Sequence, residues 1–372
     1  MIAFDRLLRP HIAAAPAYRP VQPPERRARG AQPIIKLDAN ENPYGPPPGI
    51  ADALARLPNA HRYPDPESRH LRAALAAHHN LPADNLLVGA GADELIDLIM
   101  RLFLAPGDVL LDCPPTFGMY AFDAGLHAAR VVRVPRQPDF SLDLAAIERA
   151  VVRLRPKLLF LANPNNPDGG LIPPAHLERL LQLPLILVLD EAYIEFAPPG
   201  HSRLHQVLQR QNLIVLRTFS KWAGLAGLRV GWGVFPGWLM PHLWKAKQPY
   251  NVSVIAQQAA RLALCRADWL AETRDKIVAE RERLFARLDA LPWLSPYPSA
   301  ANFILCRVQE SPRSTERLPP RSAAQLTQDL ARQGILVRHF DKPGLADHIR
   351  ISVGTPDHTA RLLRAIQEWG KG

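Results

Sequence analysis

The sequence predicts an α/β protein in which a mostly parallel, seven-stranded sheet lies between helices and a smaller α+β domain follows. Three observations support this prediction. Short, continuously apolar segments alternate with helical patterns up to about residue 254, as expected of strands buried on both faces. From about residue 255, long helical stretches replace this alternation and precede three short strand patterns. With 372 residues, the chain is long enough for about two to three domains.

The strands expected in the large sheet are the segments 85–88, 109–112, 131–134, 158–162, 185–189, 213–216 and 229–234. Between them, residues 93–103 form an amphipathic helical pattern with acidic residues in the first turn. Asp65 and Pro66 are expected to be the N-cap and first-turn residues of a helix that runs through Ala77. Because strands and helices alternate, functional groups are expected at the carboxyl ends of the strands.

The second part of the chain is expected to begin with helices over 256–265 and 268–291. Strands over 302–307, 334–338 and 349–353 follow, and a final helix begins near Thr355. We therefore expect an arm over residues 1–37, a large domain over 38–254 and a small domain over 255–372.

Basic residues and prolines concentrate at the beginning of the chain. Lys and Arg number 45 and Asp and Glu 35, which gives a net charge of +10, and 38 residues are proline. Residues 1–37 carry seven basic and two acidic side chains, and residues 1–50 contain ten of the prolines. A Pro- and Arg-rich arm over 1–37 accounts for much of both excesses. No recognition helix or RNA-binding signature accompanies them, which argues against the alternative of a nucleic-acid-binding protein.

The compartment is expected to be the cytoplasm. The sequence has neither the apolar core of a secretory signal nor the ~20 apolar residues of a membrane helix. Cys113, Cys265 and Cys306 are scattered and form no CxxC pair. This pattern favours a reducing compartment, buried apolar roles for the three thiols, no structural metal and no membrane partner.

The strongest chemical signal is a lysine in the segment 217–229, which follows the strand expected over 213–216. Lysine is scarce, with eight residues against 37 arginines, yet Lys221 lies among small and apolar neighbours. Partial desolvation and nearby cations would lower its pKa, as a Schiff-base lysine requires. Ser220 and Arg229 could bind a phosphate. Taken alone, the segment is also compatible with a surface lysine at a strand end.

Asp190 ends an apolar segment and is the second signal. A buried carboxylate is costly unless it is paired with a cation. A protonated pyridine nitrogen is such a partner in a pyridoxal site, and Tyr193 could hydrogen-bond the phenolate of the same cofactor. A metal ligand or a structural salt bridge is the alternative for Asp190.

Two turns and two arginines add weaker signals. The turn NPNNPDGG (163–170) could supply an Asn amide to a ring oxygen, and the Gly-rich turn GAGAD (89–93) could bind phosphate at a helix start. Arg338 and Arg350 follow in strands of the second domain and could bind carboxylate and phosphate, or could form ordinary surface ion pairs.

Together, these elements resemble, in kind and in order, the type I fold of pyridoxal-phosphate aminotransferases. The segments LDANENPYG (37–45), YPDP (63–66), CPPTFGMY (113–120) and DEAYIEF (190–196) are similar to one class II family, the histidinol-phosphate aminotransferases. The resemblance extends from Leu37 to the C-terminus and does not include the arm. It implies that the large domain binds the cofactor, with its first residues packing on the small domain.

The resemblance also implies roles around the cofactor ring. Lys221 would bind the cofactor covalently and later carry a proton at the substrate's α-carbon. Asp190 would pair with the pyridine nitrogen. Asn166 and Tyr193 would hold the ring oxygen, and Phe117 would stack on the ring.

Further roles concern the phosphate and the substrates. The cofactor phosphate would be held by Ala92, Asp93, Ser220 and Arg229. Tyr63 would reach that phosphate from the other subunit of a homodimer with shared sites. Arg350 would bind the carboxylate of glutamate or 2-oxoglutarate, and Arg338, with Tyr44, would read a phosphate on the second substrate.

Two residues depart from the family pattern. Phe117 stands where Tyr is usual, so stacking is kept and a hydroxyl is lost. Asp168 stands where Thr is usual in the Asn-Pro-Thr-Gly turn, and Asp can make a similar Asx turn. Neither change affects Lys221, Asp190 or Arg229.

The activity that these implications favour is amino transfer between L-histidinol phosphate and 2-oxoglutarate in histidine biosynthesis. The alternatives of the same fold are an L-threonine-O-3-phosphate decarboxylase and an aromatic amino-acid aminotransferase. The segment from Asn40 to Tyr44 favours the first activity.

Overall fold

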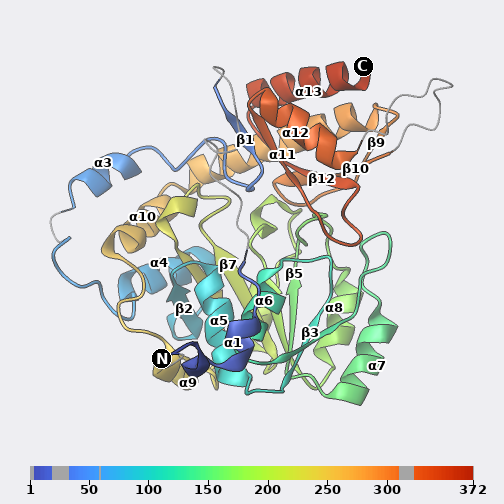
Figure 1. Ribbon diagram of the computed structural model, residues 1–372. Helices are drawn as coiled ribbons and strands as arrows, with labels where there is room; N and C mark the ends of the chain where they lie inside the picture. Colours follow the sequence, from blue (N-terminus) through green and yellow to red (C-terminus); the bar gives the residue numbers. More distant parts are fainter. Residues whose placement is uncertain (1–3, 19–32, 58–59, 310–321, 372) are drawn as a thin grey trace.

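A seven-stranded sheet forms the centre of the larger part of the molecule. The computed structural model describes residues 4–18, 33–57, 60–309 and 322–371 (Figure 1). The strands of the large sheet are β2 (Leu86–Gly89), β3 (Val109–Asp112), β4 (Arg130–Arg133), β5 (Leu158–Ala162), β6 (Ile186–Asp190), β7 (Leu213–Thr218) and β8 (Gly231–Val234). Their order is β2-β8-β7-β6-β5-β3-β4. All neighbours run parallel except β8, which is antiparallel to β2 and β7. This confirms the predicted mostly parallel seven-stranded sheet.

Each of the seven expected segments overlaps one of these strands. The largest difference at a strand start is in β8, which begins at Gly231 instead of residue 229. Arg229 has a left-handed backbone, with φ of 52°, so the chain turns there before it enters the strand.

Helices cover both faces of the large sheet, because the side chains of its strands alternate between two hydrophobic cores. Leu159 and Leu161 lie in one core, and Leu158 and Phe160 lie in the other. The first core is closed by α3 (Ile50–Ala55), α4 (Arg69–His79), α7 (Leu144–Leu154), α8 (Pro174–Leu181) and α10 (Val254–Leu264). The second core is closed by α5 (Ala92–Phe103), α6 (Met119–Leu126) and α9 (Met240–Ala246). Short 3-10 helices lie between these elements: η2 (Ala83–Asn85), η3 (Ile194–Phe196), η4 (Leu204–Leu208) and η5 (Ala226–Leu228).

A second sheet of five strands, in the order β1-β11-β12-β10-β9, forms the smaller part. Its strands are β1 (Ile35–Leu37), β9 (Leu294–Pro296), β10 (Phe303–Val308), β11 (Ile335–His339) and β12 (His348–Ser352). The helices α12 (Ala323–Arg332) and α13 (Pro356–Lys371) cover it (Figure 1). The three strands and the final helix expected in this part are found, whereas β1 and β9 were not expected.

Part of the predicted arm belongs to the folded body. Its last residues form β1, which pairs in parallel with β11. Its first described residues form η1 (Phe4–Leu7) and α1 (Pro10–Ala14), and His11 Nε2 of α1 lies 3.2 Å from the carbonyl oxygen of Leu126 in α6. Residues 19–32 of the predicted arm, with four of its arginines, lie outside the described residues.

The chain passes from one sheet to the other through α10 and α11 (Ala267–Asp289). Helix α10 packs against α4 and α3 and lies in the first core of the large sheet. Helix α11 adds Leu270 and Ile277 to that core, and Leu284 and Leu288 to the core of the small sheet. We propose that the two domains divide within α11, later than the expected boundary at 254–255.

Helix α4 begins later than expected. Asp65 was predicted to be its N-cap, but the helix starts at Arg69, and Ser68, with φ of 50°, is the residue before it. The Asp65 carboxylate still accepts hydrogen bonds from the backbone N–H groups of Glu67 (3.2 Å) and Arg69 (2.8 Å). The acidic side chain therefore supports the start of α4 across a turn that the pattern did not reveal.

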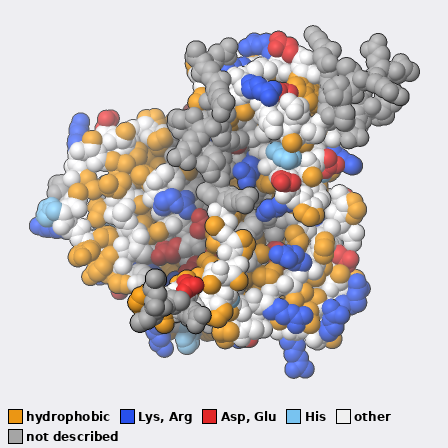
Figure 2. All heavy atoms as spheres, in the orientation of Figure 1, with side chains coloured by type: hydrophobic (Ala, Val, Ile, Leu, Met, Phe, Trp, Pro, Cys, Tyr) orange, Lys and Arg blue, Asp and Glu red, His pale blue; other side chains and the backbone are white. Residues whose placement is uncertain are grey.

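The thiols follow the expectation in part. Cys113 and Cys306 are buried, and Cys265, which follows α10, is exposed, so the prediction of a buried role is wrong for Cys265. In the described part of the chain, no helix is long and apolar enough to cross a membrane. On the face drawn in Figure 2, Lys and Arg side chains are scattered among apolar and uncharged ones.

Replacing Phe160 with Ala should lower the free energy of unfolding by about 3–5 kcal/mol, because it leaves a cavity in the second core. Phe160 is fully buried in β5, whereas Val152 on α7 is 80% exposed. The matched control Val152→Ala should change stability by less than about 0.5 kcal/mol. Urea denaturation followed by tryptophan fluorescence measures both, and equal midpoints for the two variants would contradict the assignment of the core.

Candidate active site

The predicted site residues gather at the carboxyl edge of the large sheet. Strands β5, β6 and β7 lie side by side and run parallel, so their ends meet at one edge. Asn166 follows β5, Asp190 ends β6, and Lys221 follows β7. The start of α5 follows β2 at the same edge. The sheet therefore brings segments that are distant in sequence into one site.

Lys221 is a desolvated amine. Its Nζ donates a hydrogen bond to the Ala39 carbonyl oxygen at 3.0 Å and lies 5.9 Å from the centre of the Tyr193 ring. Burial, and then the positive charge of Arg350, lower the pKa of Lys221 to about 8. A substantial fraction of this amine is therefore neutral, and nucleophilic, near physiological pH.

Asp190 is a buried carboxylate with only neutral hydrogen-bond donors. It is 5% exposed, and it accepts hydrogen bonds from the Tyr120 hydroxyl (2.8 Å) and the Ala192 backbone N–H (3.1 Å). Burial raises the pKa of Asp190 to about 6. The described residues form no ion pair with it, so this carboxylate suits a cationic group of a ligand, such as a protonated ring nitrogen.

Tyr193 presents its hydroxyl between two amides. The hydroxyl oxygen accepts from Asn40 Nδ2 at 3.1 Å and lies 3.5 Å from Asn166 Nδ2. Burial raises the pKa of Tyr193, which therefore keeps its proton. A hydroxyl and an amide placed together in this way can both donate to one ligand oxygen.

Two glycines shape a cradle beside the start of α5. A Cβ on Gly91, whose φ is 87°, would lie 2.5 Å from Arg229 Nη2. A Cβ on Gly231 would lie 2.4 Å from the backbone nitrogen of Ala92. Glycine at both positions therefore lets the Arg229 guanidinium and strand β8 approach the first turn of α5.

The cradle carries the donors that a phosphate requires. Arg229 is oriented by Asp93, through an ion pair of 2.7 Å, and its Nη1 lies 3.4 Å from Ser220 Oγ. The free N–H groups at a helix start, a hydroxyl and a guanidinium all bind anions. Because the carboxylate of Asp93 binds Arg229, Asp93 could contribute to an anion only through its backbone N–H.

Arg338 and Arg350 lie opposite each other on β11 and β12, as register partners. Arg350 donates to the Asn166 side-chain oxygen and to the Asp38 carbonyl oxygen (2.9 Å), and its buried Nε has no hydrogen-bond partner in the described structure. Burial lowers the pKa of Arg350 to about 10, so it remains a cation. The small sheet thus places the Arg350 guanidinium beside groups of the large sheet, with Arg338 opposite it on the neighbouring strand.

The two residues that depart from the family pattern both have neighbours at the site. The Phe117 ring lies edge-on to Tyr120, with 5.5 Å between ring centres. The Asp168 carboxylate accepts from the Gly170 N–H at 2.8 Å and from the Asn165 amide. The first of these bonds is the expected Asx turn.

Within the described chain, two predicted residues form no side-chain hydrogen bond and no ring contact with the other predicted site residues. Tyr63 is 82% exposed and stacks on Tyr250, with ring centres 4.6 Å apart. Tyr44 faces Lys276 of α11, whose Nζ lies 5.8 Å from the ring centre. The position of Tyr63 is compatible with a role toward a second subunit, whereas Tyr44 has no contact that links it to Arg338.

Three further residues at this site were not among the predicted ones. Tyr120, which binds Asp190, and Asn40, which binds Tyr193, are both part of motifs that carried the resemblance. Tyr18 of the arm packs edge-on against Phe122. It also raises the pKa of Arg350, whereas burial lowers it. The motif wording signalled the first two, and no pattern in the sequence signalled Tyr18.

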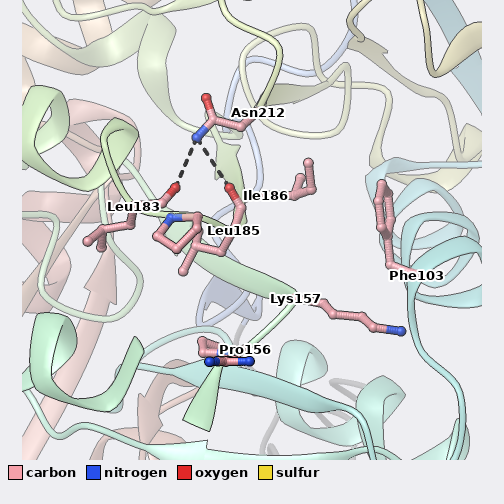
Figure 3. Close-up of a pocket in the computed structure, with 9 residues that line it drawn as sticks. Phe103, Pro156, Lys157, Leu183, Leu185, Ile186 and Asn212 are labelled. Carbon is pink, nitrogen blue, oxygen red and sulfur yellow. Dashed lines mark hydrogen bonds between the residues drawn. The ribbon is translucent and has the colours of Figure 1, made fainter. Parts of the chain in front are cut away.

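A cavity of about 460 Å³ lies at the opposite edge of the sheet (Figure 3). It is lined by Phe103 at the end of α5, by Ile186 at the start of β6, and by residues that precede β5, β6 and β7, among them Lys157 and Asn212. The Asn212 amide donates to the carbonyl oxygens of Leu183 (3.4 Å) and Leu185 (3.2 Å) and fastens the segment before β6. None of the predicted site residues lines this cavity. Among the described residues, no group of three His, Cys, Asp or Glu side chains is arranged to hold a metal ion.

Comparison with known proteins identifies the chain's relatives. A model of the family described as aminotransferase class I and II matches residues 32–366. The chain is 51% identical over 371 residues to a histidinol-phosphate aminotransferase of Roseiflexus castenholzii, covering 97% of this chain and 98% of the relative. It is 49% identical over 369 residues to the chloroplastic histidinol-phosphate aminotransferase 1 of Arabidopsis thaliana, covering 98% of this chain and 86% of the relative.

A solved structure gives the same result. The crystal structure of histidinol-phosphate aminotransferase from Sinorhizobium meliloti, in complex with pyridoxal-5'-phosphate, matches with a TM-score of 0.88 and 30% identity, covering 98% of this chain and 97% of that one. The desolvated lysine, the carboxylate without an ion pair and the anion cradle fit that cofactor's aldehyde, ring nitrogen and phosphate. The chain belongs to the class I and II aminotransferase family, whose members use pyridoxal phosphate, and within it to the histidinol-phosphate aminotransferases.

Proposed function

We propose that this protein transfers an amino group between L-histidinol phosphate and 2-oxoglutarate, giving imidazole-acetol phosphate and L-glutamate in histidine biosynthesis. The observation that carries the proposal is the placement of Arg350 of the small sheet beside a desolvated lysine of the large sheet, with the guanidinium-bearing Arg338 as the register partner of Arg350. One substrate carries a phosphate and the other carries carboxylates, so both present anions to these guanidiniums.

Lys221 is assigned two tasks. Its neutral amine binds the cofactor covalently at the aldehyde carbon. The Lys221 amine would also remove the proton from the substrate's α-carbon and return it at the C4′ atom of the cofactor. When bound, pyridoxal phosphate accepts the electron pair that remains on the α-carbon.

The other residues orient and hold the cofactor. Asp190 pairs with the protonated ring nitrogen, and its buried position keeps water from that ion pair. Tyr193 and Asn166 donate to the ring oxygen, and Phe117 stacks on the ring. The cofactor phosphate is assigned to Ala92, Asp93, Ser220 and Arg229.

The assignments to substrates follow the two arginines. Arg350, which Asn166 and the Asp38 carbonyl fix in place, binds the carboxylate of glutamate or 2-oxoglutarate. Arg338, which forms no hydrogen bond or ion pair with a described side chain, is assigned to the phosphate of histidinol phosphate. Tyr44, whose ring lies 5.8 Å from Lys276 Nζ of α11, is assigned to the same phosphate.

Assembly and compartment are part of the same proposal. A homodimer with shared active sites would explain the exposed stack of Tyr63 on Tyr250, because Tyr63 would reach the phosphate cradle of the partner. A cytoplasmic location is supported by the free, buried thiols of Cys113 and Cys306.

Replacing Lys221 with Ala should lower the rate of amino transfer about 10⁴-fold or more, because the same side chain binds the cofactor and moves the proton. Borohydride reduction of the wild-type holoenzyme, followed by peptide mapping, should place the pyridoxyl adduct on Lys221. Lys247 is the matched control, since burial also lowers its pKa. An adduct on Lys247, or an active Lys221→Ala variant, would refute the assignment.

The rate at which the apoenzyme binds pyridoxal phosphate should rise with pH through about 8 and then level off. Only the neutral amine reacts, and the pKa of Lys221 is lowered to about 8, whereas an ordinary lysine would give a rate that rises to about pH 10. Stopped-flow absorbance measures the profile. Arg350→Gln removes one cause of the lowered pKa and should move the profile to higher pH; a midpoint that does not move would contradict the proposed influence of Arg350.

Replacing Arg338 with Ala should lower kcat/KM for histidinol phosphate by about 10- to 100-fold, because a charge-assisted contact to phosphate is lost. The value for glutamate should change by less than about threefold, since Arg350 keeps its own partners. Steady-state kinetics with each substrate measures the difference, and Arg332→Ala, on the exposed side of the same domain, is the control.

Equal losses for both substrates would contradict the role of Arg338.

Single-turnover spectra test the alternatives of the same fold. Rapid conversion of the cofactor by phenylalanine but not by histidinol phosphate would identify an aromatic aminotransferase. Release of carbon dioxide from phosphothreonine would identify a decarboxylase.

A further inference from the structure

One aromatic ring lies against both Arg338 and Arg350, the two arginines that are assigned to the substrates. Phe340 directly follows β11 and begins the segment 340–347 that leads to β12. The centre of its ring is 5.6 Å from the guanidinium carbon of Arg338 and also 5.6 Å from that of Arg350. Both distances are within the range in which a cation is attracted to the face of an aromatic ring.

The Phe340 ring offsets a repulsion between two cations that the strand register places opposite each other. Arg338 and Arg350 are direct partners on antiparallel strands, and like charges in such positions repel each other. The charge of Arg338 is one of the causes, after burial, that lower the pKa of Arg350. A ring that attracts both cations holds them side by side in spite of this repulsion.

The two arginines depend on Phe340 to different degrees. Arg350 also lies 5.2 Å from the ring centre of Phe303 and donates to the Asn166 side chain and to the Asp38 carbonyl oxygen. Arg338 forms no hydrogen bond or ion pair with any side chain that the structure describes, and its aromatic contact there is Phe340. Loss of the ring should therefore free Arg338 far more than Arg350.

Phe340 packs against side chains from both parts of the molecule. It packs against a small cluster in which Phe140, Leu305 and Leu345 are buried. Phe140 lies between β4 and α7 of the large domain, whereas Leu305 is in β10. The position of the ring is thus defined by packing across the junction between the two sheets.

We infer that Phe340 is a positioning residue that orients Arg338 toward the phosphate of the substrate and so favours histidinol phosphate over substrates that lack this group. This inference rests on the proposed function. Because Arg350 has its own partners, the recognition of the carboxylate depends little on Phe340.

The test is a spectral titration of the half-reaction of the holoenzyme with each amino donor. Phe340→Ala should raise the half-saturating concentration of histidinol phosphate about ten-fold, the size expected of a partly desolvated cation–π contact. The value for glutamate should rise less than about two-fold, and the maximal rates should stay unchanged, since Phe340 does not touch the reacting atoms.

Two further variants separate the aromatic face from simple packing. Phe340→Tyr should behave like the wild type because it keeps the ring. Phe340→Leu keeps apolar volume but no ring, so it should resemble Phe340→Ala. His339→Ala is the matched control, since it removes the 2.8 Å contact of His339 with the Ala346 carbonyl across the same segment and leaves the ring in place. Wild-type behaviour of Phe340→Leu, or equal losses for both donors, would overturn the inference.

Inorganic phosphate provides a readout that does not require histidinol phosphate as a substrate. Its dissociation constant from the wild-type holoenzyme, measured by titration calorimetry, should rise about ten-fold in Phe340→Ala. An unchanged constant would overturn the inference. If the wild type reacts with glutamate but not with histidinol phosphate, the proposed function fails, and the phosphate measurement still decides the role of Phe340.

Discussion

The desolvation of charged groups at the carboxyl edge of the large sheet is the constraint on which the rest of the site depends. Apart from Ile186, the partly buried first residue of β6, strands β5, β6 and β7 are buried, so the polar groups of this region are confined to the strand ends. There, burial raises the pKa of Asp190 to about 6 and lowers that of Lys221 to about 8. Burial therefore favours the neutral form of both groups. A ligand that offers Asp190 a positive charge, or Lys221 a carbon with which to form a covalent bond, would interact favourably with them.

Arg350 connects this edge with the second sheet. It lies in β12 and donates to Asn166, which follows β5, and to the Asp38 carbonyl oxygen, which follows β1. The Phe303 ring lies near both Arg350 and Tyr193: its centre is 5.0 Å from the Tyr193 ring centre and 5.2 Å from the guanidinium carbon of Arg350. A change in the position of the small sheet would therefore alter the hydrogen bonds of the groups that face the cofactor, and recognition of the substrate is tied to the geometry of the chemical site.

The strands and the central site could be predicted because their signals are local. A continuous apolar run such as Leu158–Ala162, followed by a turn of Asn, Pro and Gly, has few other structures available. The three residues of β1 could not be predicted, because their partner β11 lies about 300 residues later in the chain. Tyr120 and Asn40 stand in motifs that carried the family resemblance, but their contacts with Asp190 and Tyr193 join distant parts of the chain, and periodicity alone does not distinguish a buried Tyr from a core residue. The late start of α4 reflects a turn at Ser68 whose positive φ no local preference indicated.

The excess of arginine over lysine in this chain has a physical consequence at this site. Arginine supplies 37 of the 45 basic residues, and it keeps its proton under conditions in which lysine does not. The same kind of burial that lowers the pKa of Lys221 to about 8 lowers that of Arg350 only to about 10. One pocket therefore contains a fixed cation, suited to anions, and a neutral amine, suited to a carbonyl carbon. Exchanging the two residue types would remove both functions, because a lysine at 350 would lose charge and an arginine at 221 could not act as a nucleophile.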